Sequence, residues 1–269
     1  MTTAINLSRL HNRKEQIRES FMKKQPFRYT VIDNFLCEDA AESIFKEFPS
    51  VDPASWVDAS GLHSKRKWTQ PTIEESFAAN FYQEINSDSF REWLSDVVGI
   101  PDLLSDPDLQ GAGLHQTLEG GYLDVHVDFN KHNRLQLDRR LNLIVYLCRE
   151  HNTKGEGYLE LWDMEKKQLL DSIPPAFNTC VIFETNEVSF HGHPKPWKNN
   201  YDETRKSLSV YYYTEGRNDI PEVSEHSTIY VNTEGQTGAL KTIKNAARDI
   251  MRLGPIRRRL ADRKKKNNG

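Results

Sequence analysis

The sequence of 269 residues predicts a mainly β protein with flanking helices, of the α+β class, built around a closed or sandwiched antiparallel sheet. One observation is that apolar residues between about Leu109 and Thr214 recur with strand spacing, in short runs separated by turn residues. Another is that apolar residues before Leu109 recur mainly with helical spacing. We therefore expect helices to precede most of the sheet and to buttress its outer face.

The N-terminal part of the chain alternates between helical and extended patterns. Residues 1–25 are basic and weakly amphipathic, as in a short helical segment, and 27–33 is typical of a strand because aromatic and β-branched residues dominate it. Helices are predicted at 38–48 and 71–98, where apolar side chains recur every three to four residues. The stretch 49–70 is rich in Ser, Asp, Trp and Lys, and we expect a loop there.

The central part of the chain carries the predicted sheet. Strands are expected at 112–118, 121–129, 139–148, 157–163, 179–184, 187–191 and 205–214. Residues 143–147 are almost continuously apolar, which is typical of a strand buried on both faces. After Gly216 the chain is polar, and it closes with a predicted helix at 239–253 and a basic end.

These patterns predict a basic N-terminal helical segment (1–25), a sheet domain with buttressing helices (26–217, core about 109–216), and a polar linker, helix and basic tail (218–269). The formal charge of -3 is distributed unevenly, with +4 in 1–25, +9 in 241–269 and -16 in between. Basic ends on an acidic body indicate solvated or partner-binding termini. They argue against a nucleic-acid enzyme with a basic cleft.

The cysteine content and the hydropathy pattern indicate the cellular setting. Cys37, Cys148 and Cys180 are too few and too scattered for a disulfide framework or a zinc knuckle. The N-terminus has no apolar signal core, and no run approaches membrane-spanning length. We therefore expect a protein of the reducing cytoplasm, without a membrane span.

The main candidates for chemistry are His126 and Asp128, within the predicted strand 121–129. Side chains two residues apart on a strand point to the same face, so this pair can bind one metal ion together. A second imidazole is available at His191, at the end of a later strand, with His193 as the alternative. Two His and one carboxylate on one face of an octahedral ion leave three positions open, as in non-haem Fe(II) oxygenases.

The open positions require a group that activates dioxygen. The co-substrate 2-oxoglutarate can do this, because it chelates iron through its C1 carboxylate and C2 keto oxygen, and its far carboxylate then needs a fixed cation, preferably a guanidinium. Arg205 begins a predicted strand and Ser207 shares its face, so both can bind that carboxylate. Tyr122 shares the metal-binding face by the same count, and Asn142 could reach the co-substrate or only a backbone group.

These residues resemble the Fe(II)/2-oxoglutarate-dependent dioxygenases of the prolyl 4-hydroxylase-like branch. The resemblance runs from about 109 to 216, with a looser match at 28–36. The matching stretches are 121–123 leading to 126–128, 139–143 with 146–147, 157–162, 189–192 and 205–209. The position three residues before the first ligand His, usually Tyr in prolyl hydroxylases, is Leu123 here.

The resemblance implies a double-stranded β-helix, or jelly roll, with the metal at its mouth. It implies that His126, Asp128 and His191 bind Fe(II), and that Arg205 and Ser207 anchor 2-oxoglutarate. The implied activity is hydroxylation of an unactivated C–H bond of a small molecule or a protein side chain. O2 is consumed, and CO2 and succinate are released.

Other classes of protein remain open from the sequence. A cupin-like metal-binding protein would share the barrel but typically uses His-x-His followed by Glu, and a zinc hydrolase would leave Arg205 without a role. A non-catalytic jelly-roll binding module would not need the three ligands. Asp128 argues against a halogenase, which needs that coordination position vacant for halide. The primary substrate and the oligomeric state stay open, and we expect 49–70 and 130–138 to select the substrate.

Overall fold

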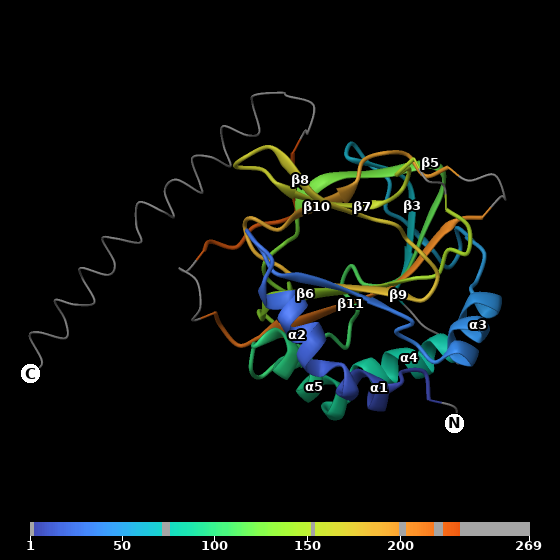
Figure 1. Ribbon diagram of the computed structural model, residues 1–269. Helices are drawn as coiled ribbons and strands as arrows, with labels where there is room; N and C mark the ends of the chain where they lie inside the picture. The colour runs from blue at the N-terminus through green and yellow to red at the C-terminus, as the bar shows by residue number, and fades with distance from the viewer. Residues whose placement is uncertain (1–2, 72–75, 152–153, 199–202, 218–222, 232–269) are drawn as a thin grey trace, which may run out of the picture.

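The computed structural model describes residues 3–71, 76–151, 154–198, 203–217 and 223–231. Within these residues the strands form one twelve-stranded sheet that curls into a barrel, with helices packed along one side (Figure 1). The prediction of a mainly β jelly-roll fold with flanking helices is therefore confirmed. The predicted helix at 239–253 and the basic end lie outside the described residues.

The described helices precede most of the barrel strands. They are α1 (Leu7–Asn12), α2 (Lys14–Met22), α3 (Glu38–Glu47), α4 (Phe77–Ile85) and α5 (Asp88–Val98). The side chain of Ser87 accepts a hydrogen bond from the backbone N–H of Phe90 and so caps the start of α5, and Gly99, with a φ of 69°, ends it. The single helix expected at 71–98 is therefore wrong: a separate α5 begins after its own cap, and Asn86 ends α4.

The described strands pair with antiparallel neighbours. They are β1 (Tyr29–Asp33), β2 (Val57–Asp58), β3 (Ser64–Gln70), β4 (Leu104–Ser105), β5 (Gly113–Val127), β6 (Asp138–Tyr146), β7 (Leu159–Asp163), β8 (Gln168–Ile173), β9 (Thr179–Glu184), β10 (Phe190–His193), β11 (Arg205–Thr214) and β12 (Ile229–Tyr230). Along the main path the order is β1-β9-β6-β11-β5-β10-β7-β8, while β3 and β12 also pair with β5. The predicted strands 112–118 and 121–129 thus form one long strand, β5.

The barrel has two layers, which Figure 1 shows edge on. Strands β6, β9 and β11 lie in the layer that faces the helices, and β5, β7, β8 and β10 lie in the opposite layer. Helices α1, α2, α4 and α5 pack beneath the first layer (Figure 1). The helices therefore buttress one outer face of the sheet, as the sequence predicted, and leave the space between the layers for a site.

Strand β6 shows how one sequence builds both the core and the cavity between the layers. Every second residue packs into the apolar core shared with the helices: Leu141, Leu143 and Val145. The residues between them line the cavity: Asn142, Ile144 and Tyr146. On β11 the same alternation places Leu208 in the core and Ser207 in the cavity. The strand that contains 143–147, predicted to be buried on both faces, therefore faces the core on one side and the cavity on the other.

The N-terminal helices pack into the same core. Ile17 and Phe21 of α2 are buried, and α2 contacts β1 and α5. Burial of a large apolar side chain stabilises a fold by about 1.5–3 kcal/mol. In the structure the basic segment 1–25 therefore packs against the sheet domain.

Strands β3 and β8 are not among the strands predicted from the sequence. β3 lies inside 49–70, so the expectation of a loop is wrong for its last seven residues. Its sequence has no apolar alternation, and it is held by an extended ladder to β5. β8 is an outer strand paired with β7, and most of its residues are only partly buried. Both strands are held by backbone pairing with a neighbour, and their sequences show only a weak pattern of apolar side chains.

Candidate metal centre

The three predicted ligands come together from two neighbouring strands. His126 lies near the end of β5 and Asp128 directly after it, while His191 on β10 is the residue paired with His126 across the ladder. Ligand atoms of the three side chains all lie within 4.8 Å of one another. Each residue is buried, with 9% of its surface or less exposed. The fold therefore gathers residues that are 65 positions apart in the sequence into one cluster.

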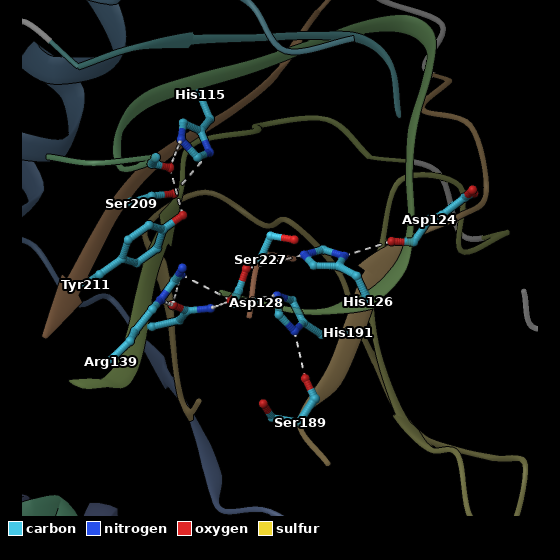
Figure 2. Close-up of polar contacts among 12 residues, drawn as sticks. His115, Asp124, His126, Asp128, Arg139, Ser189, His191, Ser209, Tyr211 and Ser227 are labelled. Atoms are coloured by element: carbon cyan, nitrogen blue, oxygen red, sulfur yellow. Dashed lines mark hydrogen bonds and ion pairs between the residues drawn. The ribbon is translucent and has the colours of Figure 1, made fainter. Parts of the chain in front are cut away.

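Backbone carbonyls fix the tautomer of both imidazoles. Nδ1 of His126 lies 2.8 Å from the carbonyl oxygen of Asp124, and Nδ1 of His191 lies 2.9 Å from that of Ser189 (Figure 2). A carbonyl oxygen only accepts hydrogen bonds, so each Nδ1 carries the proton and each Nε2 keeps its lone pair. Histidines that bind metals are commonly held in this way.

The free nitrogens and the carboxylate are spaced as ligands of one ion would be. Nε2 of His126 lies 3.5 Å from Oδ1 of Asp128, and Nε2 of His191 lies 3.4 Å from Oδ2. Nitrogen and oxygen ligands bind transition metals at about 2.0–2.2 Å, so neighbouring ligands on one ion lie about 3 Å apart. The donor set therefore fits a metal ion held by two His and one carboxylate, with positions left open.

Two donors from β6 hold the carboxylate of Asp128. Nδ2 of Asn142 donates to Oδ2 at 2.6 Å. Nη2 of Arg139 lies 3.1 Å from the same oxygen, and Figure 2 shows Arg139 directed toward Asp128. Burial acts to raise the pKa of Asp128, but Arg139 and both imidazoles outweigh it and hold the pKa well below its usual range. The carboxylate is therefore ionised at neutral pH and available to a cation.

Arg139 is a site residue to which sequence reasoning assigned no role. It is fully buried, with Cζ 3.5 Å from the ring centre of Tyr211 and 4.4 Å from that of Phe129. The available signal was an Arg on a strand otherwise buried on both faces, because a buried charge needs a partner. Asn142, expected to reach the co-substrate or a backbone group, donates to Asp128, accepts from Arg139 and also lines the cavity.

The predicted anchor Arg205 lines the same cavity, whose volume is about 190 Å³. Its Nε donates to the carbonyl oxygen of Gly157 at 2.7 Å, and its Nη2 donates to the hydroxyl of Tyr146 at 3.3 Å. A Cβ on Gly157 would lie 2.4 Å from the ring of Trp197, so a glycine is required where this carbonyl meets Arg205. Ser207 also lines the cavity. The structure therefore brings Arg205 and Ser207 together with the metal cluster.

Tyr122 is not among the residues that line this cavity. β10 pairs with β5 through His191 and His126, and again through His193 and Leu123, so three steps along β5 correspond to two along β10. Beyond this bulge the side chains of β5 point to the opposite face from the one expected by counting. Leu123 therefore lines the cavity in place of Tyr122. Counting residues by two fails wherever a strand contains such a bulge.

Three further basic side chains line the described cavity: Lys67 of β3, His115 of β5 and His193 of β10. Burial lowers the pKa of His115 and of His193 well below the usual range, and nearby cations reinforce this. Both imidazoles are therefore neutral at physiological pH. His193, the alternative to His191, shares the cavity, but the ligand cluster found in the described chain contains His191.

The polar stretch after Gly216, expected to be a linker, returns to the site. Its short strand β12 pairs with the end of β5, so that Tyr230 lies opposite His126. The ring of Tyr230 lies 5.2 Å from that of His126 and stacks on His63 at 4.4 Å. Tyr230 also lines the cavity and so covers the metal cluster on this side.

Comparisons with known proteins show what the barrel is similar to. Residues 112–213 match the model of the 2OG-Fe(II) oxygenase superfamily. The chain is 29% identical to prolyl 3-hydroxylase OGFOD1 of Mus musculus over 194 residues, which is 70% of this chain and 33% of the mouse protein. The chain therefore spans about a third of the length of this curated relative.

Two solved structures share the fold. A prolyl 4-hydroxylase from Phytophthora capsici superposes with a TM-score of 0.53 at 15% identity, covering 80% of this chain and 67% of that one. A Pseudomonas putida prolyl-4-hydroxylase superposes with a TM-score of 0.51 at 15% identity, covering 74% and 99%. These comparisons agree with the resemblance noted in the sequence: residues 112–213 are similar to the 2OG-Fe(II) oxygenase superfamily, and the barrel has the fold of the two prolyl 4-hydroxylases.

Among the described helices, none is long and apolar enough to cross a membrane.

Proposed function

We propose that this protein is an Fe(II)- and 2-oxoglutarate-dependent oxygenase that hydroxylates an unactivated C–H bond of a small molecule or a protein side chain. The supporting observation is one cavity that contains two unprotonated imidazole nitrogens, an ionised carboxylate and a fixed guanidinium. Bound together, Fe(II) and 2-oxoglutarate activate O2 and supply an oxidant able to remove hydrogen from such a bond, with CO2 and succinate as products.

The metal would be held by His126, Asp128 and His191. The carbonyls behind each Nδ1 prevent the rings from turning, so both Nε2 atoms face the ion without reorganisation. Arg139 and Asn142 both contact Oδ2 of Asp128, which leaves Oδ1 as the less encumbered oxygen. These two side chains therefore orient the carboxylate and keep it ionised.

The far carboxylate of 2-oxoglutarate would bind Arg205. Its guanidinium spends two N–H groups on Gly157 and Tyr146, and the others remain for a carboxylate. Because the hydroxyl of Tyr146 accepts from Arg205, its own hydrogen is free to donate to the same carboxylate. Burial raises the pKa of Tyr146, so this hydroxyl stays protonated. Ser207 offers a further hydroxyl on the same face.

Apolar side chains separate these polar groups and restrict water. Phe129, Ile144 and Leu159 line the cavity between its polar residues, and Tyr230 covers the metal cluster. A small, partly apolar cavity directs an oxidant to a bound C–H group and limits its loss to solvent.

Anaerobic titration with Fe(II) and 2-oxoglutarate tests this proposal. Wild-type protein should develop a weak visible metal-to-ligand charge-transfer band, which Asp128→Ala should abolish. Arg205→Met should weaken 2-oxoglutarate binding at least tenfold, because a charge-assisted bidentate contact is lost. Arg149→Met, on an Arg that pairs with Glu42 away from the cavity, is the matched control and should behave as wild type.

The same titration separates the rival classes. A zinc hydrolase, a cupin-like binding protein or a non-catalytic module would give no 2-oxoglutarate-dependent band and would not respond to Arg205→Met. Substrate-stimulated succinate formation, measured over a library of small molecules and peptides, then identifies the primary substrate. If no band forms in the wild type, the proposal is wrong.

The remaining expectations form part of the proposal. Direct partners are 2-oxoglutarate, O2 and the primary substrate. The described cysteines are all free, which supports a reducing compartment, the cytoplasm. The segments 1–25, 26–217 and 218–269 are proposed as an N-terminal helical segment, an oxygenase domain and a C-terminal tail.

A further inference from the structure

The cavity contains an excess of positive charge. Its described lining includes the cations Lys67, Arg139 and Arg205, against Asp128 as the carboxylate. Arg139 is paired with Asp128, and Arg205 is bound to Gly157 and Tyr146. The ammonium group of Lys67 forms no hydrogen bond or ion pair with any described residue. An ammonium group in a small cavity without a partner requires an explanation, since desolvating a charge is costly.

Lys67 and Arg205 reach the cavity from strands on either side of β5. Across the sheet, Lys67 of β3 is paired with Thr117 of β5, which is paired with Arg205 of β11. All three residues line the cavity, and neighbouring strands lie about 4.8 Å apart. The guanidinium of Arg205 contacts the hydroxyl of Tyr146, which lies on β6 beyond β11 from β3, and the carbonyl oxygen of Gly157. Lys67 and Arg205 are therefore separate cations of one cavity, near enough for the positive charge of Arg205 to act on Lys67.

The charges of the proposed complex leave Lys67 unbalanced. Fe(II) with Lys67, Arg139 and Arg205 carries five positive charges, while Asp128 and the 2-oxoglutarate dianion carry three negative ones. Iron and Arg205 would take the two ends of 2-oxoglutarate, and Arg139 has Asp128. No group of the complex is left to pair with Lys67.

From this placement we infer that Lys67 binds an acidic group of the primary substrate, so that the substrate is a molecule or peptide with a carboxylate or phosphate close to the hydroxylated carbon. The inference rests on the proposed oxygenase function and names its substrate class. Lys67 lines the cavity and is only half-buried. An ammonium is a compact point charge that suits either anion.

Two further observations agree with a substrate role. His193 also lines the cavity, and its buried Nδ1 has no hydrogen-bond partner, so a polar substrate has a second group to contact. Burial lowers the pKa of Lys67 to about 8, against the opposing effect of Asp128. Lys67 thus stays mostly charged at neutral pH, and a bound anion would raise this pKa again. The cavity volume of about 190 Å³ admits only a small part of a substrate beside 2-oxoglutarate.

Small anions test the inference without knowledge of the substrate. The full chain is loaded anaerobically with Fe(II) and 2-oxoglutarate, and the charge-transfer band and melting temperature are followed while acetate, inorganic phosphate or neutral acetamide is added. Wild-type protein should respond to acetate or phosphate and not to acetamide, and comparison of the two anions distinguishes a carboxylate from a phosphate substrate. Lys67→Met should weaken anion binding at least tenfold, as expected for a lost charged contact.

Matched variants separate charge from structure. Lys67→Arg keeps a cation and should retain most of the anion response. Lys65→Met removes an exposed lysine of the same strand that does not line the cavity, and it should behave as wild type. In Lys67→Met the affinity for 2-oxoglutarate should change less than about twofold, since Arg205 is intact.

Several outcomes would overturn the inference. One is a wild-type response to acetamide equal to that to acetate, or no response to either anion. Another is unchanged anion binding in Lys67→Met. A tenfold loss of 2-oxoglutarate affinity in Lys67→Met with normal anion binding would make Lys67 a co-substrate anchor instead. Absence of the charge-transfer band in the wild type would refute the oxygenase proposal itself, whereas a normal band without an anion effect refutes only this inference.

Discussion

In the described part of the chain, two clusters of potential ligands combine histidine with aspartate, and only one of them is prepared for a metal. The first is His126, Asp128 and His191, described above. The second is Asp106, Asp108 and His132, whose potential ligand atoms also lie within 4.8 Å of one another. The two clusters differ in what the backbone offers to the imidazoles.

In the second cluster the backbone donates to the ring instead of accepting from it. Nδ1 of His132 accepts from the N–H groups of Arg134 and Leu135, at 3.2 and 3.1 Å. Nδ1 is therefore the unprotonated nitrogen, and Nε2 carries its hydrogen to Asp106 at 3.0 Å. That nitrogen has no lone pair for an ion. The carboxylate of Asp106 also accepts from the N–H groups of Asp108 and Gln110, so this cluster closes a turn.

The difference teaches that residue type and proximity do not define a metal site. In the metal cluster each Nε2 lies 3.4 or 3.5 Å from Asp128, which leaves room for an ion between them. In the second cluster the nearest pair is already joined by a hydrogen bond. A backbone carbonyl that accepts a hydrogen bond from Nδ1 leaves Nε2 free to bind a metal. Backbone N–H groups that donate to Nδ1 instead leave the proton on Nε2, and the imidazole then serves as a structural donor.

The largest expected effect is loss of the metal in Asp128→Asn. The amide keeps the shape of the side chain but removes the negative charge, so metal affinity should fall by about 1000-fold or more. The measurement is calorimetric titration of the anaerobic protein with Fe(II), with circular dichroism to confirm the fold. Affinity within tenfold of wild type would show that Asp128 is not a ligand.

The next effect concerns the pH dependence of the metal-free protein. Burial lowers the pKa of His191 to about 4, with Asp128 opposing it, whereas an unfolded His titrates near 6.5. Between these values the unfolded chain binds a proton that the folded chain does not. The free energy of unfolding should therefore fall as pH drops from 6.5 to 4, by about 3 kcal/mol from this residue. Urea unfolding across this range should show a shallower pH dependence in His191→Gln, and equal slopes would contradict the assignment.

A smaller effect on stability, and none on the metal, is expected in the second cluster. Asp106→Asn offers one acceptor oxygen where the carboxylate offers two, and its amide group faces hydrogen-bond donors. The free energy of unfolding should fall by about 2–3 kcal/mol. Fe(II) and 2-oxoglutarate binding should stay within about twofold of wild type. Loss of the charge-transfer band in a folded variant would mean that the two clusters are coupled.

The smallest effect should come from the residues that support the metal ligand. Asn142→Leu removes the hydrogen bond to Asp128 and an acceptor of Arg139, but the ion pair between Arg139 and Asp128 can still form. Loss of one such partner typically costs 10–100-fold in metal affinity, and we expect the lower end, about tenfold, because Arg139 remains. Fe(II) titration measures it. A loss as large as that of Asp128→Asn would place Asn142 among the ligands.

Much of the barrel and its metal cluster followed from local patterns. Alternation placed the strands that became β6, β9 and β11, and His126 and Asp128 share a face because they lie two residues apart. Continuous apolar sequence at 143–147 correctly indicated burial on both faces. These features depend on neighbouring residues, which a linear sequence displays directly.

Other features required the pairing of distant strands. Lys67 lies on β3, whose sequence shows no regular spacing of apolar residues. This strand is held by its ladder to β5. Tyr122 was placed by counting, and a bulge in β5 presents Leu123 to the cavity instead. Tyr230 reaches His126 only because β12 returns to β5. No local signal in these stretches reports their partners.

By itself, the sequence determined the class of fold and the chemical types gathered for the metal, because strand periodicity and ligand chemistry are local properties of the chain. Tertiary structure alone decided which imidazole nitrogens are free, how Arg139 supports Asp128, and that Lys67 enters the same cavity. The reason is that protonation, burial and convergence depend on atoms that are distant in sequence and meet only when the sheet closes.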